Sequence, residues 1–126
     1  MIFVLDTSAI LALLLDEPGT AMVAEVVRGS ELSAVNHCEV MSKIAENGAD
    51  RDETHQILLD YGIRIRAFRE EHALEAARLR PLTSHLGLSL GDRACLAQGH
   101  FSDRPILTAD RRMAEADVGL DIRMIR

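Results

Sequence analysis

The sequence is poor in the residues that cross-link or stack small proteins together. Its 126 residues include two cysteines, no tryptophan and only 3% aromatic residues. Cys38 and Cys95 lie far apart and belong to no C-x-x-C or Cys/His cluster, which excludes a disulfide framework and a zinc knuckle. We therefore expect two buried free thiols and an aliphatic core. A chain of this length can bury such a core unaided, so we expect a single domain over residues 1–126.

Long apolar runs and an export signal are also missing. No basic residue precedes the N-terminal apolar run, and Asp6 interrupts that run. The uninterrupted stretch from Leu11 to Leu15 is far too short to span a bilayer. We therefore expect a cytoplasmic protein that makes no membrane contact.

Positive charge is scarce, and lysine is almost absent. The net charge is -6, and Lys43 is the only lysine. This balance argues against a protein that grips nucleic acid by neutralising phosphates alone. Arginine is nevertheless concentrated after Ile63, where the chain contains eleven Lys/Arg and nine Asp/Glu. Genomic base composition explains this bias; alternatively, some arginines flank a phosphate-bearing substrate, namely Arg64, Arg66, Arg93, Arg111 and Arg112.

Short apolar runs alternate with helical patterns along nearly the whole chain. The expected strands are Ile2 to Leu5, Leu32 to Val35, Ile63 to Phe68, Ile106 to Thr108 and Ile122 to Ile125. The expected helices are Ser8 to Leu15, Thr20 to Arg28, Asn36 to Gly48, Asp50 to Tyr61, Arg69 to Arg80, Ser89 to Gly99 and Arg111 to Ala116. This alternation predicts an α/β fold with a mostly parallel central sheet of four to five strands flanked by helices.

Four acidic residues lie close to the predicted ends of strands. Asp6 directly follows the first strand, Glu39 lies in the first turn after the second, and Asp110 comes two residues after the fourth. Asp92 lies in the first turn of the helix that precedes the fourth strand. In an open parallel sheet the functional crevice lies at the carboxyl ends of the strands. We therefore expect these four carboxylates at one edge of the sheet.

Each acid also has an ordinary structural explanation. Asp6 and Asp110 are placed to cap the helices that follow them, and Glu39 is placed to pair with the only lysine at i,i+4. Asp92 is three residues after Ser89, as in a capping box. Only the four together favour a functional site over these separate roles.

Carboxylates gathered at one edge repel one another unless a cation is present. Oxygen ligands without a neighbouring His or Cys cluster favour Mg²⁺ or Mn²⁺ over zinc. A divalent cation among carboxylates can lower the pKa of a bound water and neutralise charge on a phosphodiester. The acids therefore point to metal-assisted phosphodiester hydrolysis.

The segments VLDTSAILA, the helix containing Glu39, LSLGDRACLA and ILTAD resemble the PIN-domain nucleases, in particular the VapC toxins of bacterial toxin–antitoxin pairs. The resemblance implies a PIN-like three-layer fold and an endoribonuclease that depends on Mg²⁺ or Mn²⁺. It also implies a homodimer and inhibition by a cognate VapB-type antitoxin. Residue by residue, Asp6, Glu39, Asp92 and Asp110 match the family's acidic quartet. Thr7 or Ser8, and Thr108, match hydroxyl positions that orient those acids.

This resemblance suggests a role for each acid. Asp6 and Asp92 are expected to hold a first metal ion, with Asp110 closing the same site. Glu39 is expected to bind a second metal or to position the attacking water. The uncompensated charge of the four acids further suggests that the antitoxin inserts an Arg or Lys side chain among them, imitating the metal.

Other readings of the chain fit less well. A receiver domain needs paired acids after its first strand and a late lysine, and a phosphatase with an Asp nucleophile needs a second Asp where Ser8 stands. The five histidines share no ligand spacing, and no H-E-x-x-H zinc-protease motif is present. The remaining alternative is a non-catalytic PIN-like binding module, against which the intact acidic quartet argues.

Overall fold

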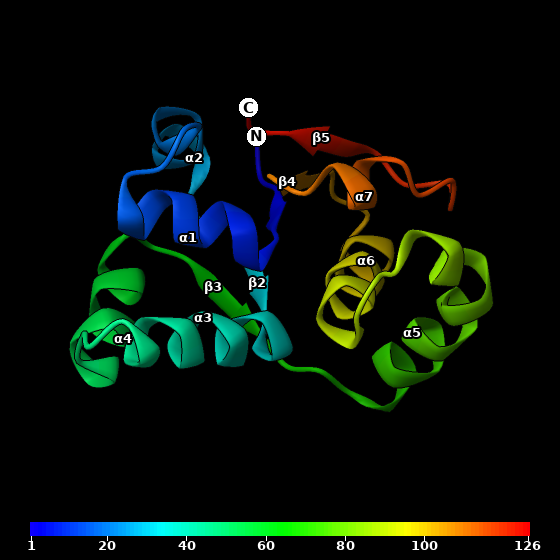
Figure 1. The fold of residues 1–126 in the computed structure, drawn as a ribbon, viewed down its shortest axis with the longest axis horizontal. Coiled ribbons are helices and arrows are strands. Elements are labelled where there is room, and N and C mark those ends of the chain that lie inside the picture. Colours follow the sequence, from blue (N-terminus) through cyan, green and yellow to red (C-terminus); the bar gives the residue numbers. More distant parts are fainter.

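The computed structural model describes all 126 residues as a central sheet with helices on both faces (Figure 1). The strands are β1 (Val4–Leu5), β2 (Glu31–Ser33), β3 (Arg64–Arg66), β4 (Ile106–Thr108) and β5 (Ile122–Met124). The helices are α1 (Thr7–Leu15), α2 (Thr20–Val26), α3 (Ala34–Glu46), α4 (Arg51–Asp60), α5 (Glu70–Thr83), α6 (Leu90–Ser102) and α7 (Arg111–Ala114), with a 3-10 turn at Ser84–Leu86. None of the helices combines the length and apolar character needed to cross a membrane.

The five strands form one sheet in the order β3-β2-β1-β4-β5. Every neighbouring pair is parallel, and β1 lies in the middle, where Val4 pairs with Glu31 on one side and Ile106 on the other. The predicted α/β class and parallel sheet are therefore confirmed. Because the strands are parallel, the residues that follow β1, β2 and β4 emerge at the same edge.

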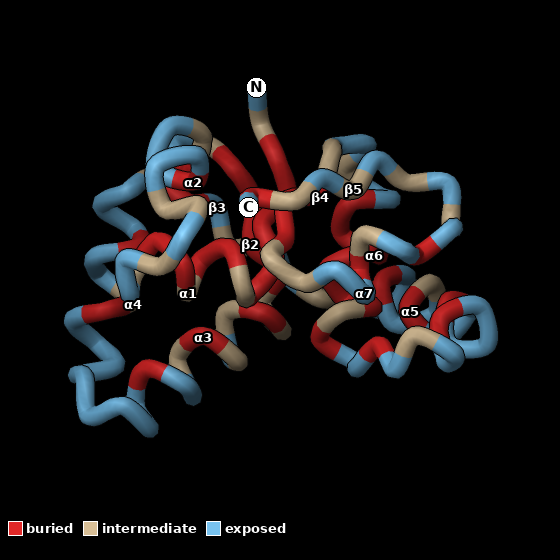
Figure 2. Tube along the Cα trace, turned by 45° about the horizontal axis from the view of Figure 1, so that its top comes forward, coloured by how far each residue is buried: buried red, intermediate tan, exposed pale blue.

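Strand alternation divides the core into two parts. Leu5, Leu32 and Leu107 point to one face and pack with α1, α2, α3 and α4. Val4 and Ile106 point to the other face and pack with α5, α6 and α7. Both faces of the central strands are therefore buried, as Figure 2 shows for the middle of the molecule. The result is the predicted three-layer arrangement.

Several helices differ from their predicted boundaries, among them α6, which ends at Ser102 and not at Gly99. Helix α3 begins at Ala34 because the Ser33 side chain caps it, accepting a hydrogen bond from the backbone N–H of Val35. Helix α5 does not stop before Pro81 but continues to Thr83. Thr83 is fully buried and its hydroxyl donates to the carbonyl of Leu79, which holds the final turn in place.

The predicted burial of both thiols is only half right. Cys95 is buried in α6, between the sheet and α5, whereas Cys38 is exposed on α3. Helix α3 packs against the core through Val40 and Ile44, and Cys38 lies off that stripe. The pattern of the helix, rather than the residue type, decides which cysteine is buried.

Candidate active site

Asp6 is the most buried of the four predicted acids. It stands between β1 and α1, is only 3% exposed, and does not cap α1 with its side chain. Its Oδ2 accepts hydrogen bonds from the hydroxyls of Ser8 (2.8 Å) and Thr108 (2.9 Å). Burial raises the pKa of Asp6 to about 6, although these hydrogen bonds oppose the shift. The negative charge of Asp92 raises the pKa further.

Ser8 and Thr108 connect Asp6 to the loop after β4. The Thr108 hydroxyl accepts a hydrogen bond from the backbone N–H of Asp110 at 3.0 Å. The Ser8 hydroxyl accepts one from the backbone N–H of Ala109 at 2.9 Å. The two hydroxyls thus fix the first acid and the turn that carries the last one relative to each other, although about a hundred residues separate them in sequence.

Glu39 lies on α3 and is held by hydrogen bonds from two side chains. Its Oε1 accepts hydrogen bonds from the Thr7 hydroxyl (2.7 Å) and from Nδ2 of Asn36 (3.1 Å). Asn36 is fully buried, and its Nδ2 also donates to the carbonyl of Gly91 at 3.0 Å. A Cβ at position 91 would collide with the Glu39 carboxylate, so glycine is what lets α6 approach this side chain.

Asp92 belongs to the capping box that opens α6. Its Oδ2 accepts a hydrogen bond from the backbone N–H of Ser89 at 2.8 Å, and the Ser89 hydroxyl accepts one from the backbone N–H of Asp92 at 3.2 Å. The ordinary explanation of this acid from sequence is therefore correct. The cap uses only one carboxylate oxygen, because Oδ1 receives no hydrogen bond from any side chain.

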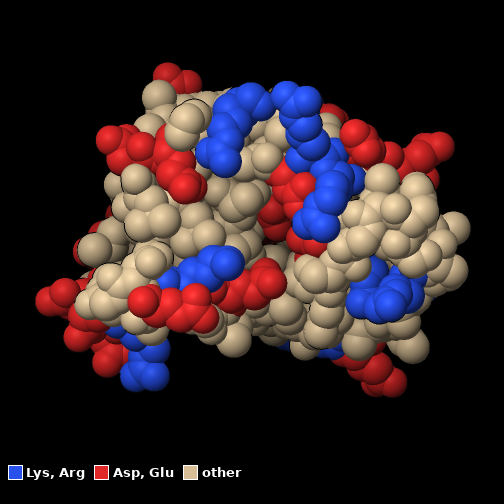
Figure 3. All heavy atoms as spheres, in the orientation of Figure 1, with Lys and Arg blue, Asp and Glu red and all other residues tan.

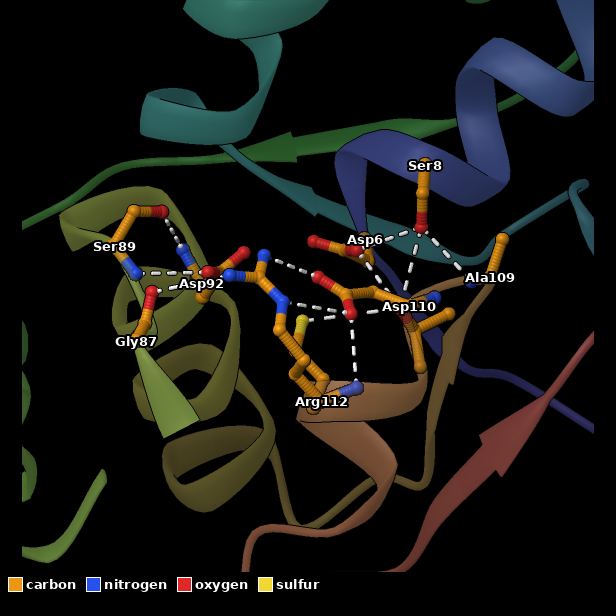
Figure 4. Close-up of polar contacts among 10 residues, drawn as sticks. Asp6, Ser8, Gly87, Ser89, Asp92, Ala109, Asp110 and Arg112 are labelled. Atoms are coloured by element: carbon orange, nitrogen blue, oxygen red, sulfur yellow. Dashed lines mark hydrogen bonds and ion pairs between the residues drawn. The ribbon is translucent and has the colours of Figure 1, made fainter. Parts of the chain in front are cut away.

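Asp110 caps α7 and is paired with an arginine. Its Oδ1 accepts hydrogen bonds from the backbone N–H (2.9 Å) and Nε (3.2 Å) of Arg112. Its Oδ2 lies 2.8 Å from Nη2 of the same guanidinium, which also donates through Nη1 to the carbonyl of Gly87 at 3.3 Å. Arg112 holds the pKa of Asp110 below its ordinary value. Figure 4 shows the guanidinium extending between Asp110 and Asp92.

Three of the four acids share one arrangement. Asp6, Glu39 and Asp92 each have one oxygen bound by the protein, and no side chain donates to the other oxygen. Burial raises the pKa of the Cys95 thiol, and the negative charges of the three acids raise it further. Acidic atoms accordingly meet in a hollow on the face drawn in Figure 3, with basic side chains beside it.

This donor set fits a hard divalent cation. Carboxylate oxygens are the ligands that Mg²⁺ and Mn²⁺ prefer, and Mg²⁺ keeps several waters rather than requiring a complete protein cage. The structure has no group of three His, Cys, Asp or Glu side chains already close enough to enclose an ion. The raised pKa of Asp6 indicates what a cation would relieve, because a nearby positive charge favours its ionised form.

The arginines predicted to flank a substrate do not share one environment. Arg93 is buried, and its Nη1 donates to the carbonyl of Ala76 at 2.9 Å, so it does not border the acids. Arg66 lies 3.7 Å from Glu31 and lines a separate cavity of about 300 Å³. Arg112 alone among these arginines is bonded to one of the four acids.

Two residues of the site were not predicted from the sequence. The sequence places Asn36 at the start of the helix that contains Glu39 and does not single out Gly91. Asn36 lies three residues before Glu39 on the same helix, a spacing that puts the two side chains on one face and was the available signal. Nothing local marks Gly91, because its role arises only where α3 and α6 meet.

Comparisons with known proteins agree with this architecture. The structure is similar to a toxin–antitoxin complex chain from Klebsiella pneumoniae, with a TM-score of 0.77, 17% identity and 98% of each chain covered. It is also similar to FitAcB from Neisseria gonorrhoeae, with a TM-score of 0.72, 23% identity and 96% of each chain covered. A third similar structure is VapBC2 from Rickettsia felis bound to a promoter DNA fragment, with a TM-score of 0.71, 16% identity and 98% of each chain covered.

No curated protein matches the sequence. At these identities the similar structures speak for the fold alone. The sequence itself matches the family model for the PIN domain over residues 3–119. That match includes β1 with Asp6, the start of α6 with Asp92, and the turn after β4 with Asp110. The chain therefore belongs to the PIN domain family.

Proposed function

We propose that this protein is a Mg²⁺- or Mn²⁺-dependent endoribonuclease toxin that hydrolyses RNA phosphodiester bonds. The observation that supports it most is the shared arrangement of Asp6, Glu39 and Asp92. Each carboxylate is fixed through one oxygen and leaves the other without a side-chain donor. A carboxylate that is held through one oxygen can offer the other to a hard cation. A helix cap or a surface ion pair does not require this arrangement.

The roles of the residues follow from their positions. Asp6 and Asp92 hold the cation, Asp110 closes the site, and Glu39 binds a second ion or orients the attacking water. Thr7, Ser8 and Thr108 keep the acids in place through hydrogen bonds to Glu39 and Asp6. When bound, the divalent ion supplies positive charge to the phosphodiester and lowers the pKa of the attacking water.

The proposal extends to partners. Similar structures include complexes described as toxin–antitoxin assemblies, and an acidic hollow attracts a basic segment. We infer a cognate VapB-type antitoxin that places an Arg or Lys among the four acids, where it excludes the metal. The protein acts as a homodimer in the cytoplasm, with residues 1–126 forming one PIN domain.

Cleavage of a panel of structured RNAs tests the catalytic proposal. Wild type is expected to cut at least one RNA with Mg²⁺ or Mn²⁺ and to stop when EDTA is added. Asp6→Asn and Asp92→Asn are expected to lower the rate by about a hundredfold or more, as when a transition-state charge partner is removed. Asp121→Asn is the matched control, because Asp121 is exposed and paired with Arg123 far from the acids.

Two outcomes would contradict the mechanism. Cleavage that survives EDTA, or that survives both Asp→Asn substitutions, would show that carboxylates and metal do not carry the reaction. Expression in a host cell covers the case in which the panel lacks the target. Growth arrest relieved by Asp6→Asn supports an active toxin, whereas no arrest and no cleavage would favour a non-catalytic binding module.

A further inference from the structure

Asp110 differs from the other three acids in one respect: both of its oxygens are occupied by the protein. Oδ1 serves α7 as its cap, accepting the backbone N–H of Arg112 at 2.9 Å. Oδ2 has a single partner, Nη2 of Arg112 at 2.8 Å. Without that guanidinium, Asp110 would match Asp6, Glu39 and Asp92, with one oxygen bound to the protein and the other without a side-chain donor.

The guanidinium also lies between Asp110 and Asp92, with 55% of the Arg112 side chain exposed. The hydrogen bond and charge of Asp110 raise the pKa of Arg112, and the charge of Asp92 raises it further. Nη1 of Arg112 donates to the carbonyl of Gly87, in the turn before α6. Arg112 therefore spans from α7 to the segment that carries Asp92, across the place where these two acids face each other (Figure 4). A cation held by both acids would have to share that place.

The chain contains a second pair with nearly the same local geometry. Arg123 binds Asp121 through Nε (3.1 Å) and Nη2 (2.7 Å), again with the acid two residues before the arginine. Asp121 has 57% of its side chain exposed, against 23% for Asp110. The bidentate pair is thus ordinary in form, and what sets the Arg112 pair apart is the acid that it covers.

We propose that Arg112 is an internal competitor of the divalent cation: in the free protein its guanidinium occupies Oδ2 of Asp110, and it must leave before Asp110 can bind metal. This inference rests on the proposed function and concerns how its metal site is loaded. The bidentate fork makes the contact specific, because it needs two guanidinium nitrogens, Nε and Nη2, against both carboxylate oxygens. Lysine at this position would keep the charge but lose the fork.

Metal binding by the RNA-free protein tests the competition without reference to activity. Isothermal titration with Mn²⁺ is expected to show Arg112→Ala binding more tightly than wild type by about tenfold, equivalent to about 1.4 kcal/mol. Arg112→Lys is expected to bind more tightly than wild type and more weakly than Arg112→Ala. Arg111→Ala is the matched control, because it removes one positive charge from the same helix without touching Asp110.

The gain must also depend on Asp110. In the double variant Arg112→Ala/Asp110→Asn the tighter Mn²⁺ binding is expected to disappear. If it persists there, or if Arg111→Ala tightens binding as much as Arg112→Ala does, the effect is general charge and the competition is wrong. Equal affinity for wild type and Arg112→Ala, with Mn²⁺ binding lost in Asp6→Asn, would overturn the competition while leaving the metal site intact.

Failure of the proposed function gives a different result. If no variant binds Mn²⁺, including Arg112→Ala, both the metal site and its internal competitor are excluded. If wild type binds none and Arg112→Ala does, the competition is supported in its strongest form. Circular dichroism of each variant accompanies the titrations, because Asp110 also caps α7 and an unfolded variant would lose binding for that reason.

Discussion

At the scale of single residues, Asp6 is the place where the fold and the charge of the site conflict. Its carboxylate is enclosed by β1, β4 and α1, and its only side-chain partners are two neutral hydroxyls. Two neutral donors compensate a buried negative charge less well than water does. The fold therefore favours the protonated form of Asp6, whereas a bound cation would favour the ionised form.

This conflict predicts how the metal-free protein responds to pH. The pKa of Asp6 is about 6 in the folded state against an ordinary 3.8, so its contribution to stability is full below about pH 4 and is lost as the pH rises through 6. Asp6→Asn is expected to raise the free energy of unfolding at pH 7.5 by about 3 kcal/mol, from the size of the shift. Urea unfolding of wild type and Asp6→Asn in EDTA, at pH 4 and at pH 7.5, measures the difference in unfolding free energy.

The same measurement has a built-in control. Asp121 is exposed, and its pKa is lowered by Arg123, so Asp121→Asn is expected to give no gain at pH 7.5. A gain for Asp6→Asn that is equally large at pH 4 would mean that it does not come from ionisation. A lower unfolding free energy of Asp6→Asn at pH 7.5 would mean that the hydrogen bonds from Ser8 and Thr108 to the carboxylate stabilise the fold by more than burial of its charge destabilises it.

At the scale of elements, the junction of α3 and α6 controls the position of Glu39. Gly91 lets α6 approach, and Asn36 ties the two helices together through the Gly91 carbonyl. Glycine in a helix normally costs about 0.5 to 1 kcal/mol relative to alanine, so its presence here favours the approach over helix stability. The contact lies at the same edge of the sheet as Asp6.

Gly91→Ala is therefore expected to separate stability from activity. The new methyl group would displace the Glu39 carboxylate, the end of a flexible side chain, from Thr7 and Asn36. We expect the unfolding free energy to change by less than about 1 kcal/mol, since alanine also favours the helix. We expect the RNA cleavage rate to fall by about tenfold or more.

The test measures the RNA cleavage rate and the unfolding free energy of Gly91→Ala. His100→Ala, on the exposed face of the same helix, is the control. Full cleavage activity in a well-folded Gly91→Ala protein would show that the position of Glu39 does not matter. A large loss of stability would show that α6, rather than Glu39, moves to relieve the collision.

The same junction marks how far the sequence could be interpreted. Strand identity and the parallel sheet follow from short apolar runs separated by helical patterns. Asp6, Glu39 and Asp110 follow from their places after strands, and Asp92 from its place at the start of a helix. The passage of α5 through Pro81 does not, because the burial of Leu79 and Thr83 outweighs a local helix breaker. The role of Asn36 does not follow either, because its partners Thr7 and Gly91 come from other elements.

Paired side chains were equally hard to foresee. The Arg112–Asp110 contact is local in sequence, yet the same spacing in Arg123 and Asp121 produces only a surface pair. The difference lies in what surrounds Asp110: Thr108 holds its backbone, and the same hydroxyl holds Asp6. Such a distinction depends on the assembled sheet edge and not on any short segment.

At the scale of the whole molecule, the two cores meet at β1 and leave a concentration of negative charge where that strand ends. Leu5 faces one core, Val4 faces the other, and Asp6 follows them at the edge. The net charge of -6 adds to the repulsion that a cation would relieve. Metal binding and folding should therefore be coupled through pH.

This coupling gives a prediction for the intact protein. A ligand that binds only the folded state at 100 times its Kd stabilises it by about 2.7 kcal/mol. For a chain of this size, with an unfolding entropy of about 2.1 cal/mol/K per residue, that corresponds to a rise in Tm of about 10 °C. We expect Mn²⁺ to raise the Tm of wild type by this amount at pH 7.5. At pH 5 the same Mn²⁺ concentration should have about half this effect, because Asp6, with a pKa of about 6, is then about nine-tenths protonated and binding is weakened about tenfold.

Thermal unfolding of wild type, Asp6→Asn and Asp121→Asn, each with Mn²⁺ or with EDTA, measures this coupling. Asp6→Asn should gain little from Mn²⁺ at either pH, whereas Asp121→Asn should behave as wild type, since its carboxylate is exposed and already paired. An equal Mn²⁺ effect at pH 5 and pH 7.5 in wild type would place the bound ion on carboxylates of ordinary pKa. The buried acid at the end of β1 would then not be the residue that couples metal to the fold.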